Sequence, residues 1–143
     1  MKGKGCLLSL PFGLFLLVHS ISVSAKSVWL ECGKYQFNLD ENRREYTTKV
    51  QLGRLPTKLV QGTATFFPSH IKFSVPTLIF PDGGGFRDDF SINRKTLEYQ
   101  QSTMSRDISY ITGDTGWVLE KRSNNPKIGI CRVIKNQTEG NKI

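Results

Sequence analysis

The aspartates of the segment "PDGGGFRDD" are the first residues of this sequence that could support chemistry. Asp82, Asp88 and Asp89 lie around three glycines, and calcium prefers oxygen ligands of this kind in flexible loops. The spacing matches no EF-hand or repeat motif, and Arg87 opposes a bound cation. No helical pattern follows the glycines, as a phosphate-binding loop would require. We therefore interpret the segment as a glycine-rich surface loop and expect neither a metal site nor a cofactor.

The tripeptide "DTG" at Asp114–Gly116 and the histidine His70 each suggest a kind of hydrolase. Aspartic proteases need two such aspartates sharing a proton, so this chain would have to dimerise. A turn with Asp and Gly at favoured positions is the simpler interpretation. His70 is predicted to face solvent, and nothing in the sequence points to the carboxylate and nucleophile that a triad requires. We expect no catalytic residues, and a hydrolase using Asp88, Asp89 or Asp114 is the least favoured hypothesis.

Positive charge is the most suggestive remaining feature. The chain has 20 Lys and Arg residues against 12 Asp and Glu residues, a formal net charge of +8. A basic surface attracts anionic glycans, lipids or acidic proteins, whereas nucleic acid is not expected because no nucleic-acid-binding motif occurs. The alternative is that the basic residues only keep the outer face of the sheet soluble. The candidates for an anionic partner fall in or beside predicted turns: Arg43, Arg44, Arg54, Lys58, Lys121, Arg122 and Lys127.

The first 25 residues have the three parts of a secretory signal peptide. Lys2 and Lys4 precede an apolar run from Cys6 to Val18, and small residues stand at Val23 and Ala25. The run is short for a membrane anchor. We predict cleavage after Ala25, no transmembrane span in the mature chain, and a location in the periplasm or outside the cell. The loss of two lysines leaves a mature net charge of about +6.

Two cysteines, Cys32 and Cys131, remain after the signal peptide is removed. An even number in an exported chain favours a disulfide, and two unpaired thiols are the alternative. Closing a loop of ~100 residues stabilises a domain by up to about 4–5 kcal/mol. The bond would make the first and last strands neighbours. The alternation of nearby residues predicts that both cysteines point away from the main apolar stripe, unless Gly33 or Gly129 marks a bulge.

All of these residues lie in or between short segments in which apolar and polar residues alternate. No helical periodicity of useful length occurs, whereas strand patterns recur at short spacing with Gly, Pro and Asn between them. The predicted fold is all-β: a small antiparallel β-barrel or clasped β-sandwich of about six to eight strands with one disulfide. It comprises one domain at 26–135 and a polar tail at 136–143. Strands are expected at 34–39, 46–52, on both sides of Pro68-Ser69 within 58–75, at 86–101, in 107–122 and at 127–134.

The segment from Phe90 to Gln100 predicts a hairpin in detail. With Arg94-Lys95 at its tip, Ile92 faces Leu97 and Phe90 faces Tyr99, so apolar side chains meet on one side. The tip lacks the favoured Asn-Gly pair, so we expect a wider turn with the same pairing.

Three motifs carry a resemblance to known proteins: "WLECGKY" at Trp29–Tyr35, "FSINRKTLEY" at Phe90–Tyr99 and "IGICRVI" at Ile128–Ile134. Together they resemble the layout of small exported proteins of marine picocyanobacteria, a resemblance that implies export and no particular activity. The chain is more loosely similar to the single-disulfide β-barrel lysozyme inhibitors of the bacterial periplasm. Their Ser-Gly-x-x-Tyr loop is absent here.

The leading functional hypothesis is a non-catalytic exported binding module. It would hold a small apolar ligand inside the barrel or an anionic partner of the cell envelope. The alternative is an inhibitor of an envelope or extracellular hydrolase that presents a loop such as 81–89 to the enzyme.

Overall fold

The protein is described by a computed structural model covering residues 27–50, 54–111, 113–122 and 126–135. The predicted signal peptide and polar tail lie outside these residues. All regular secondary structure in the described part is β, which confirms the predicted fold class. The strands are β1 (Ser27–Cys32), β2 (Tyr35–Asp40), β3 (Glu45–Val50), β4 (Lys58–Phe66), β5 (His70–Ile79), β6 (Gly85–Asn93), β7 (Glu98–Arg106), β8 (Ile108–Ser109), β9 (Gly113–Asp114), β10 (Val118–Leu119), β11 (Lys127–Ile130) and β12 (Arg132–Ile134).

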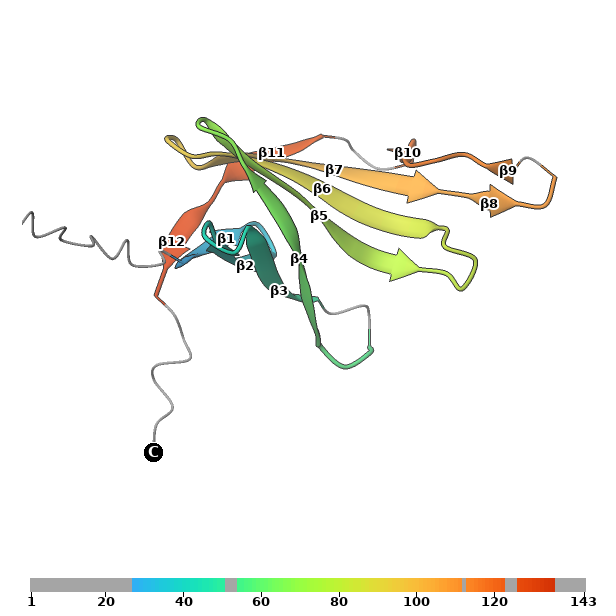
Figure 1. Ribbon diagram of the computed structural model, residues 1–143, viewed down its shortest axis with the longest axis horizontal. Coiled ribbons are helices and arrows are strands. Elements are labelled where there is room, and N and C mark those ends of the chain that lie inside the picture. Colours follow the sequence, from blue (N-terminus) through green and yellow to red (C-terminus); the bar gives the residue numbers. More distant parts are fainter. Residues whose placement is uncertain (1–26, 51–53, 112, 123–125, 136–143) are drawn as a thin grey trace, which may run out of the picture.

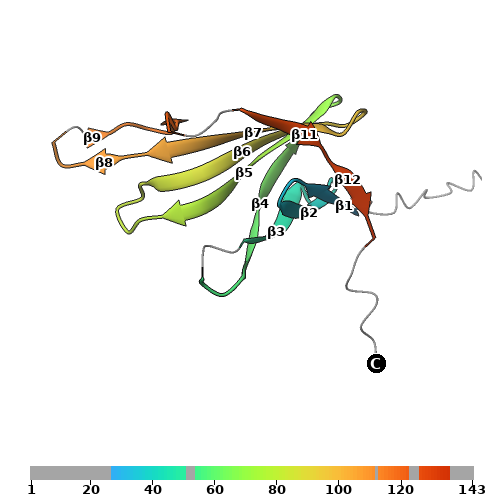
Figure 2. The same ribbon diagram turned by 180° about the vertical axis from the view of Figure 1, so that it is seen from behind.

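Ten of these strands form one antiparallel sheet that curls into a half-barrel (Figures 1 and 2). Its order is β10-β7-β6-β5-β4-β3-β2-β1-β12, so consecutive strands from β1 to β7 are neighbours. The segment predicted as the last strand is divided in two: β11 pairs with β7, and β12 pairs with β1. This C-terminal segment therefore connects the two edges of the curled sheet. Strands β8 and β9 form a separate small ribbon.

Alternate residues of the long strands form the core on the concave face. Phe37 contacts Phe73 and Phe90 at centroid distances of 4.8 and 4.9 Å, both edge to face. Tyr35 and Tyr46 extend this cluster at either end. Buried aromatic pairs stabilise a fold beyond the burial of their area. The residues that alternate with polar ones in the sequence, such as Tyr35 and Phe37 in β2 and Phe90 in β6, are therefore the residues of the core.

Cys32 and Cys131 form a disulfide, as predicted, with Cα atoms 4.3 Å apart. The predicted orientation was wrong, because both cysteines face the core and are only 1% and 2% exposed. Gly33 lies in a tight turn at φ 60°, which places Cys32 opposite Tyr35 on the same face of the sheet. At the other end of the disulfide, Ile128 and Ile130 face solvent, so Cys131, which is out of phase with them, points inward.

Strands β4 and β5 separate along most of their length (Figure 1). They pair only through residues 64–66 and 71–73, whereas β4 pairs with β3 along 58–63. The ring of Tyr46 lies against Gly62, where an added Cβ would be only 2.7 Å from the ring. Its phenolic oxygen donates a hydrogen bond to the carbonyl of Ser74 in β5, at 2.6 Å. A tyrosine side chain thus occupies the point where the two strands diverge.

The predicted hairpin exists, but its pairing was wrong. Ile92 faces Tyr99, and Phe90 faces Gln101. The side chain of Asn93 accepts hydrogen bonds from two backbone N–H groups of the turn, and Leu97 adopts a φ of 60°. These local hydrogen bonds lengthen the turn to residues 94–97, which shifts the pairing by two residues and keeps the same face buried.

The loop in the glycine-rich segment 81–89 is shorter than predicted. Strand β6 begins at Gly85, so Asp88 and Asp89 belong to a paired strand, and the connection from β5 comprises only residues 80–84.

Candidate ligand-binding pocket

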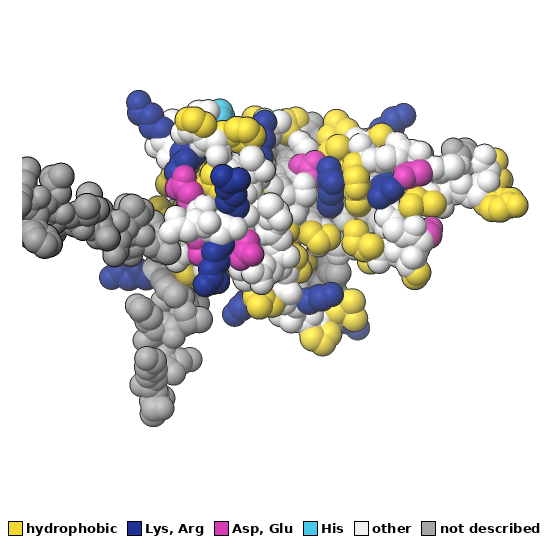
Figure 3. Space-filling model, viewed as in Figure 1, with side chains coloured by type: hydrophobic (Ala, Val, Ile, Leu, Met, Phe, Trp, Pro, Cys, Tyr) yellow, Lys and Arg dark blue, Asp and Glu magenta, His cyan; other side chains and the backbone are white. Residues whose placement is uncertain are grey.

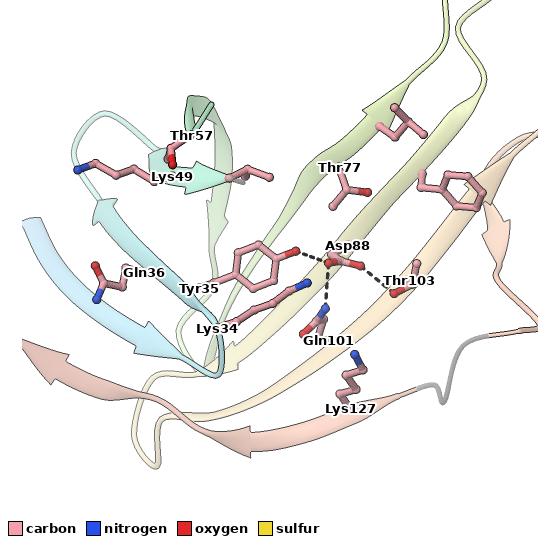
Figure 4. A pocket seen from close by; sticks show the side chains of 13 residues that line it. Lys34, Tyr35, Gln36, Lys49, Thr57, Thr77, Asp88, Gln101, Thr103 and Lys127 are labelled. Atoms are coloured by element: carbon pink, nitrogen blue, oxygen red, sulfur yellow. Dashed lines mark hydrogen bonds between the residues drawn. The ribbon is translucent and has the colours of Figure 1, made fainter. Parts of the chain in front are cut away.

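A pocket of about 690 Å³ opens on the concave side of the half-barrel (Figure 4). Its lining comes from both halves of the sheet, since Tyr35 belongs to β2, Val50 to β3, Asp88 to β6 and Gln101 to β7. This volume lies within the roughly 300–1,000 Å³ of ordinary small-molecule sites. The curl of the sheet therefore creates a cavity of ligand size from residues far apart in the sequence.

The carboxylate of Asp88 lies at the floor of the pocket and is 4% exposed. Its Oδ2 accepts hydrogen bonds from the Tyr35 hydroxyl at 2.5 Å and from Gln101 Nε2 at 2.9 Å. Its Oδ1 accepts a hydrogen bond from Thr103 Oγ1 at 2.8 Å. A buried carboxylate is costly unless its oxygens are satisfied. Three neutral donors, two from the neighbouring strand β7 and one from β2, meet this need.

Tyr35 is held as a hydrogen-bond donor by its surroundings. Burial raises the pKa of its hydroxyl far above the usual value, and the hydrogen bond to Asp88 and the negative charge of Asp88 raise it further. The hydroxyl therefore stays protonated over the whole physiological range. Tyr35 cannot act as an anionic base near neutral pH, and its role is to bind Asp88.

Two lysines flank this cluster. Lys34 lies in the β1–β2 turn with its amine 5.3 Å from the centroid of the Tyr35 ring, and Lys127 is the first residue of β11. Both extend toward the cluster in Figure 4, whereas Lys49 extends away from it. Neither Lys34 nor Lys127 forms an ion pair with a carboxylate of the described residues.

The disulfide holds the two lysine-bearing elements together. Cys32 directly precedes the turn that carries Lys34, and Cys131 directly follows the strand that begins with Lys127. The backbone N–H of Cys131 also donates to the carbonyl of Leu97, at 2.8 Å. The covalent bond therefore restricts how far the two amines can separate.

The pocket places hydrogen-bond donors beside an apolar surface. The oxygens of Asp88 already accept three hydrogen bonds, whereas the ammonium groups of Lys34 and Lys127 remain able to donate to a ligand. Val50, Leu78 and Phe86 supply an apolar wall. No group of three or more His, Cys, Asp or Glu side chains within the described ranges could hold a metal ion.

The seven basic residues predicted from the sequence lie in separate turns and strands. Arg43 and Arg44 precede β3, whereas Arg54 and Lys58 lie beyond its other end. Arg43 also contacts Asp40, at 3.8 Å. Lys121 and Arg122 follow β10. Of the seven, only Lys127 lines the pocket of Asp88.

Lys34 was not among the predicted site residues. The only signal that could have identified it is its position two residues after a cysteine, in a turn that the disulfide brings beside the C-terminal segment.

The acidic residues considered for catalysis are separated. Asp89 follows Asp88 in β6 and so points to the other face of the sheet, where it contacts Arg87 at 2.8 Å and Ser74 at 2.6 Å. Asp114 lies in β9 and pairs with Arg106; that hydrogen bond, together with the Gly116 N–H, lowers its pKa to about 2. None of these carboxylates shares a site with another.

The remaining predicted site residues have local partners. Asp82 accepts a hydrogen bond from the Gly84 N–H at 2.9 Å and so closes its own loop. His70 begins β5, with its Nδ1 2.7 Å from Ser69 Oγ. The loop proposed for an inhibitor, 81–89, is reduced to 80–84, because residues from Gly85 onward pair with β5 and β7.

The fold and the pocket define a curled antiparallel β half-barrel with a lysine-flanked pocket on its concave side. Comparison with protein-family models, with curated proteins and with solved structures finds no match to this chain. Among the described residues, no helix has the length and apolar character needed to cross a membrane.

Proposed function

We propose that this protein is a non-catalytic binding module that holds a small ligand with an acidic group in the half-barrel pocket. The observation that carries the proposal is the pair of lysine amines, Lys34 and Lys127, beside a buried carboxylate whose oxygens are already hydrogen-bonded.

Charge and shape together support an acidic ligand. The two ammonium groups outnumber the single carboxylate of Asp88, so the mouth of the pocket favours a negative group. The apolar wall of Val50, Leu78 and Phe86 gives the rest of the ligand a surface to bury. The two versions of the hypothesis drawn from the sequence, an apolar ligand and an anionic partner, thus describe two parts of one ligand.

We also propose that the module acts outside the cytoplasm. The disulfide between Cys32 and Cys131 supports this location, because such bonds persist in oxidising compartments.

The test uses 1-anilinonaphthalene-8-sulfonate, an anionic aromatic probe whose fluorescence rises in apolar sites. We expect the purified mature protein to bind it, and the variant Lys34→Gln/Lys127→Gln to bind it about tenfold more weakly, as expected for losing about 1.4 kcal/mol. The matched control is Lys95→Gln/Lys121→Gln, which removes two exposed charges outside the pocket. Equal affinities for the two variants would contradict the proposal. Native mass spectrometry of protein purified from its own cells should then reveal a retained acidic ligand.

A further inference from the structure

A second cavity adjoins the pocket. It has a volume of about 490 Å³ and lies between β4 and β5, where Tyr46 separates the two strands. Val50, Thr77 and Leu78 line both cavities, so the two cavities meet along these residues. We call the second cavity the β4–β5 groove. Its other lining residues include Leu55, Pro56, Leu59, Val60, Pro76 and Ile79.

The β4–β5 groove exposes large apolar side chains to solvent. Leu55 and Leu59 are 61% and 62% exposed, and Ile79 is 51% exposed. In Figure 3, hydrophobic and basic side chains lie together at the lower margin of the molecule, where Figure 1 places the loop that precedes β4. Contiguous exposed apolar surface with a polar border commonly marks a binding groove.

The backbone along the groove is poorly suited to an added strand. Pro76 has no N–H to donate, and the pairing of β5 with β6 shifts its register between Pro76 and Leu78. The carbonyl of Ser74 is already occupied by the Tyr46 hydroxyl. The groove therefore suits a hydrocarbon chain, which needs no backbone hydrogen bonds, better than an extended peptide.

We propose that the ligand is a single-chain amphiphile with an acidic headgroup. Its headgroup lies between Lys34 and Lys127, and its hydrocarbon tail passes Val50 and Leu78 into the β4–β5 groove. This inference rests on the proposed function, to which it adds the chemical class of the ligand. It follows from the adjacency of a lysine-flanked pocket and an apolar groove, which share three lining residues.

The test is isothermal titration of the mature protein with octanoate, decanoate and dodecanoate below their micelle concentrations. We expect affinity to rise roughly two- to fourfold for each added methylene group, since each one buries more apolar surface. The variant Leu55→Asn/Leu59→Asn should flatten this dependence, and both side chains are exposed enough for the fold to tolerate the change. Leu119→Asn, at a site 52% exposed in β10 and outside the groove, is the matched control.

The outcomes separate the two proposals. The amphiphile proposal is overturned if affinity does not depend on chain length, or if Leu119→Asn flattens this dependence as much as Leu55→Asn/Leu59→Asn does. In either case, lysine-dependent binding of the sulfonate probe would still support the acidic-ligand site. Dodecanol has the same chain length as dodecanoate but no acidic group. If it bound as tightly, the lysines would not be the headgroup site. Lys34→Gln/Lys127→Gln should weaken binding of all three acids by a similar factor. Thermal unfolding of each variant shows that the fold is retained.

Discussion

The phenolic oxygen of Tyr46 lies 2.6 Å from the backbone oxygen of Ser74 and donates a hydrogen bond to it. Beyond the pair Ala64–Phe73, the next rung of the β4–β5 ladder would join Thr63 to Ser74. The tyrosine takes the place of that rung, and Gly62 leaves room for its ring. One side chain therefore ends the pairing of two strands and stabilises the opening between them.

Replacing Tyr46 by Phe should destabilise the fold by about 0.5–1.5 kcal/mol, because one hydrogen bond is lost while the ring is kept. Urea unfolding monitored by circular dichroism measures the change. Tyr110→Phe is the control, since Tyr110 is fully exposed and its change should leave the unfolding midpoint unaltered. Equal midpoints for wild type and Tyr46→Phe would show that this hydrogen bond contributes nothing.

Removing the disulfide with Cys32→Ala/Cys131→Ala should cost up to about 4–5 kcal/mol, because the bond closes a loop with a sequence separation of 99 residues. It should also weaken binding of the sulfonate probe, since Lys34 and Lys127 are then free to move apart. Unfolding and probe titration of the wild type, with and without reductant, give the same comparison without mutation. Unchanged probe affinity after reduction would argue that the bond does not organise the pocket.

Replacing Asp88 by Asn should have opposite effects on stability and on binding. The hydrogen bonds from Tyr35, Gln101 and Thr103 would no longer reach a charged acceptor, a loss of about 1–3 kcal/mol in stability. An anionic probe should bind more tightly, because a negative charge has been removed from the floor of the pocket. Weaker binding of the probe by a folded Asp88→Asn variant would contradict the position proposed for the acidic group.

Stability should fall in alkaline solution. Burial raises the pKa of Tyr46 to about 12, and burial and Asp88 raise that of Tyr35. A tyrosine in the unfolded chain titrates near 10. Above this pH the unfolded state therefore loses protons that the folded state retains, so the free energy of unfolding decreases as pH rises. Below pH 10 both tyrosines make their full contribution to the free energy of unfolding. The contribution of Tyr46 is lost between pH 10 and 12.

Urea unfolding between pH 8 and 12 tests this dependence. Each tyrosine should contribute a slope of up to about 1.4 kcal/mol per pH unit above pH 10. Tyr46→Phe should remove its share of the slope, whereas Tyr110→Phe should not. A free energy of unfolding that is constant from pH 9 to 11 would contradict the burial of these hydroxyls.

Replacing Asn93 by Ala should destabilise the β6–β7 hairpin by about 1 kcal/mol. The side chain accepts hydrogen bonds from the N–H groups of Lys95 and Thr96, and both would lose this partner. No residue of the turn lines the pocket, so affinity for the sulfonate probe should stay within twofold of wild type. Unfolding and probe titration on the same preparation distinguish a stability effect from a binding effect.

The sequence alone determined the fold class and the covalent link. Alternation of apolar and polar residues has a period of two in strands, and it is readable wherever one face is buried, as at Tyr35, Phe37 and Leu39. Of the three cysteines, Cys32 and Cys131 could be paired once Cys6 was assigned to the predicted signal peptide. The strands of the β6–β7 hairpin were predictable for the same reason, but their pairing was not, because it depended on the local hydrogen bonds of Asn93.

Only the tertiary structure decided the direction of the cysteines and the composition of the pocket. Alternation is interrupted by tight turns, so the phase of Cys32 relative to Tyr35 depended on the conformation of Gly33. Curling of the sheet brings Lys34 and Lys127 to one cavity although 93 positions separate them in the sequence. A periodic pattern records which face of a strand is buried; which buried faces meet is set by twist, bulges and the wedge of Tyr46, none of which has a local signature.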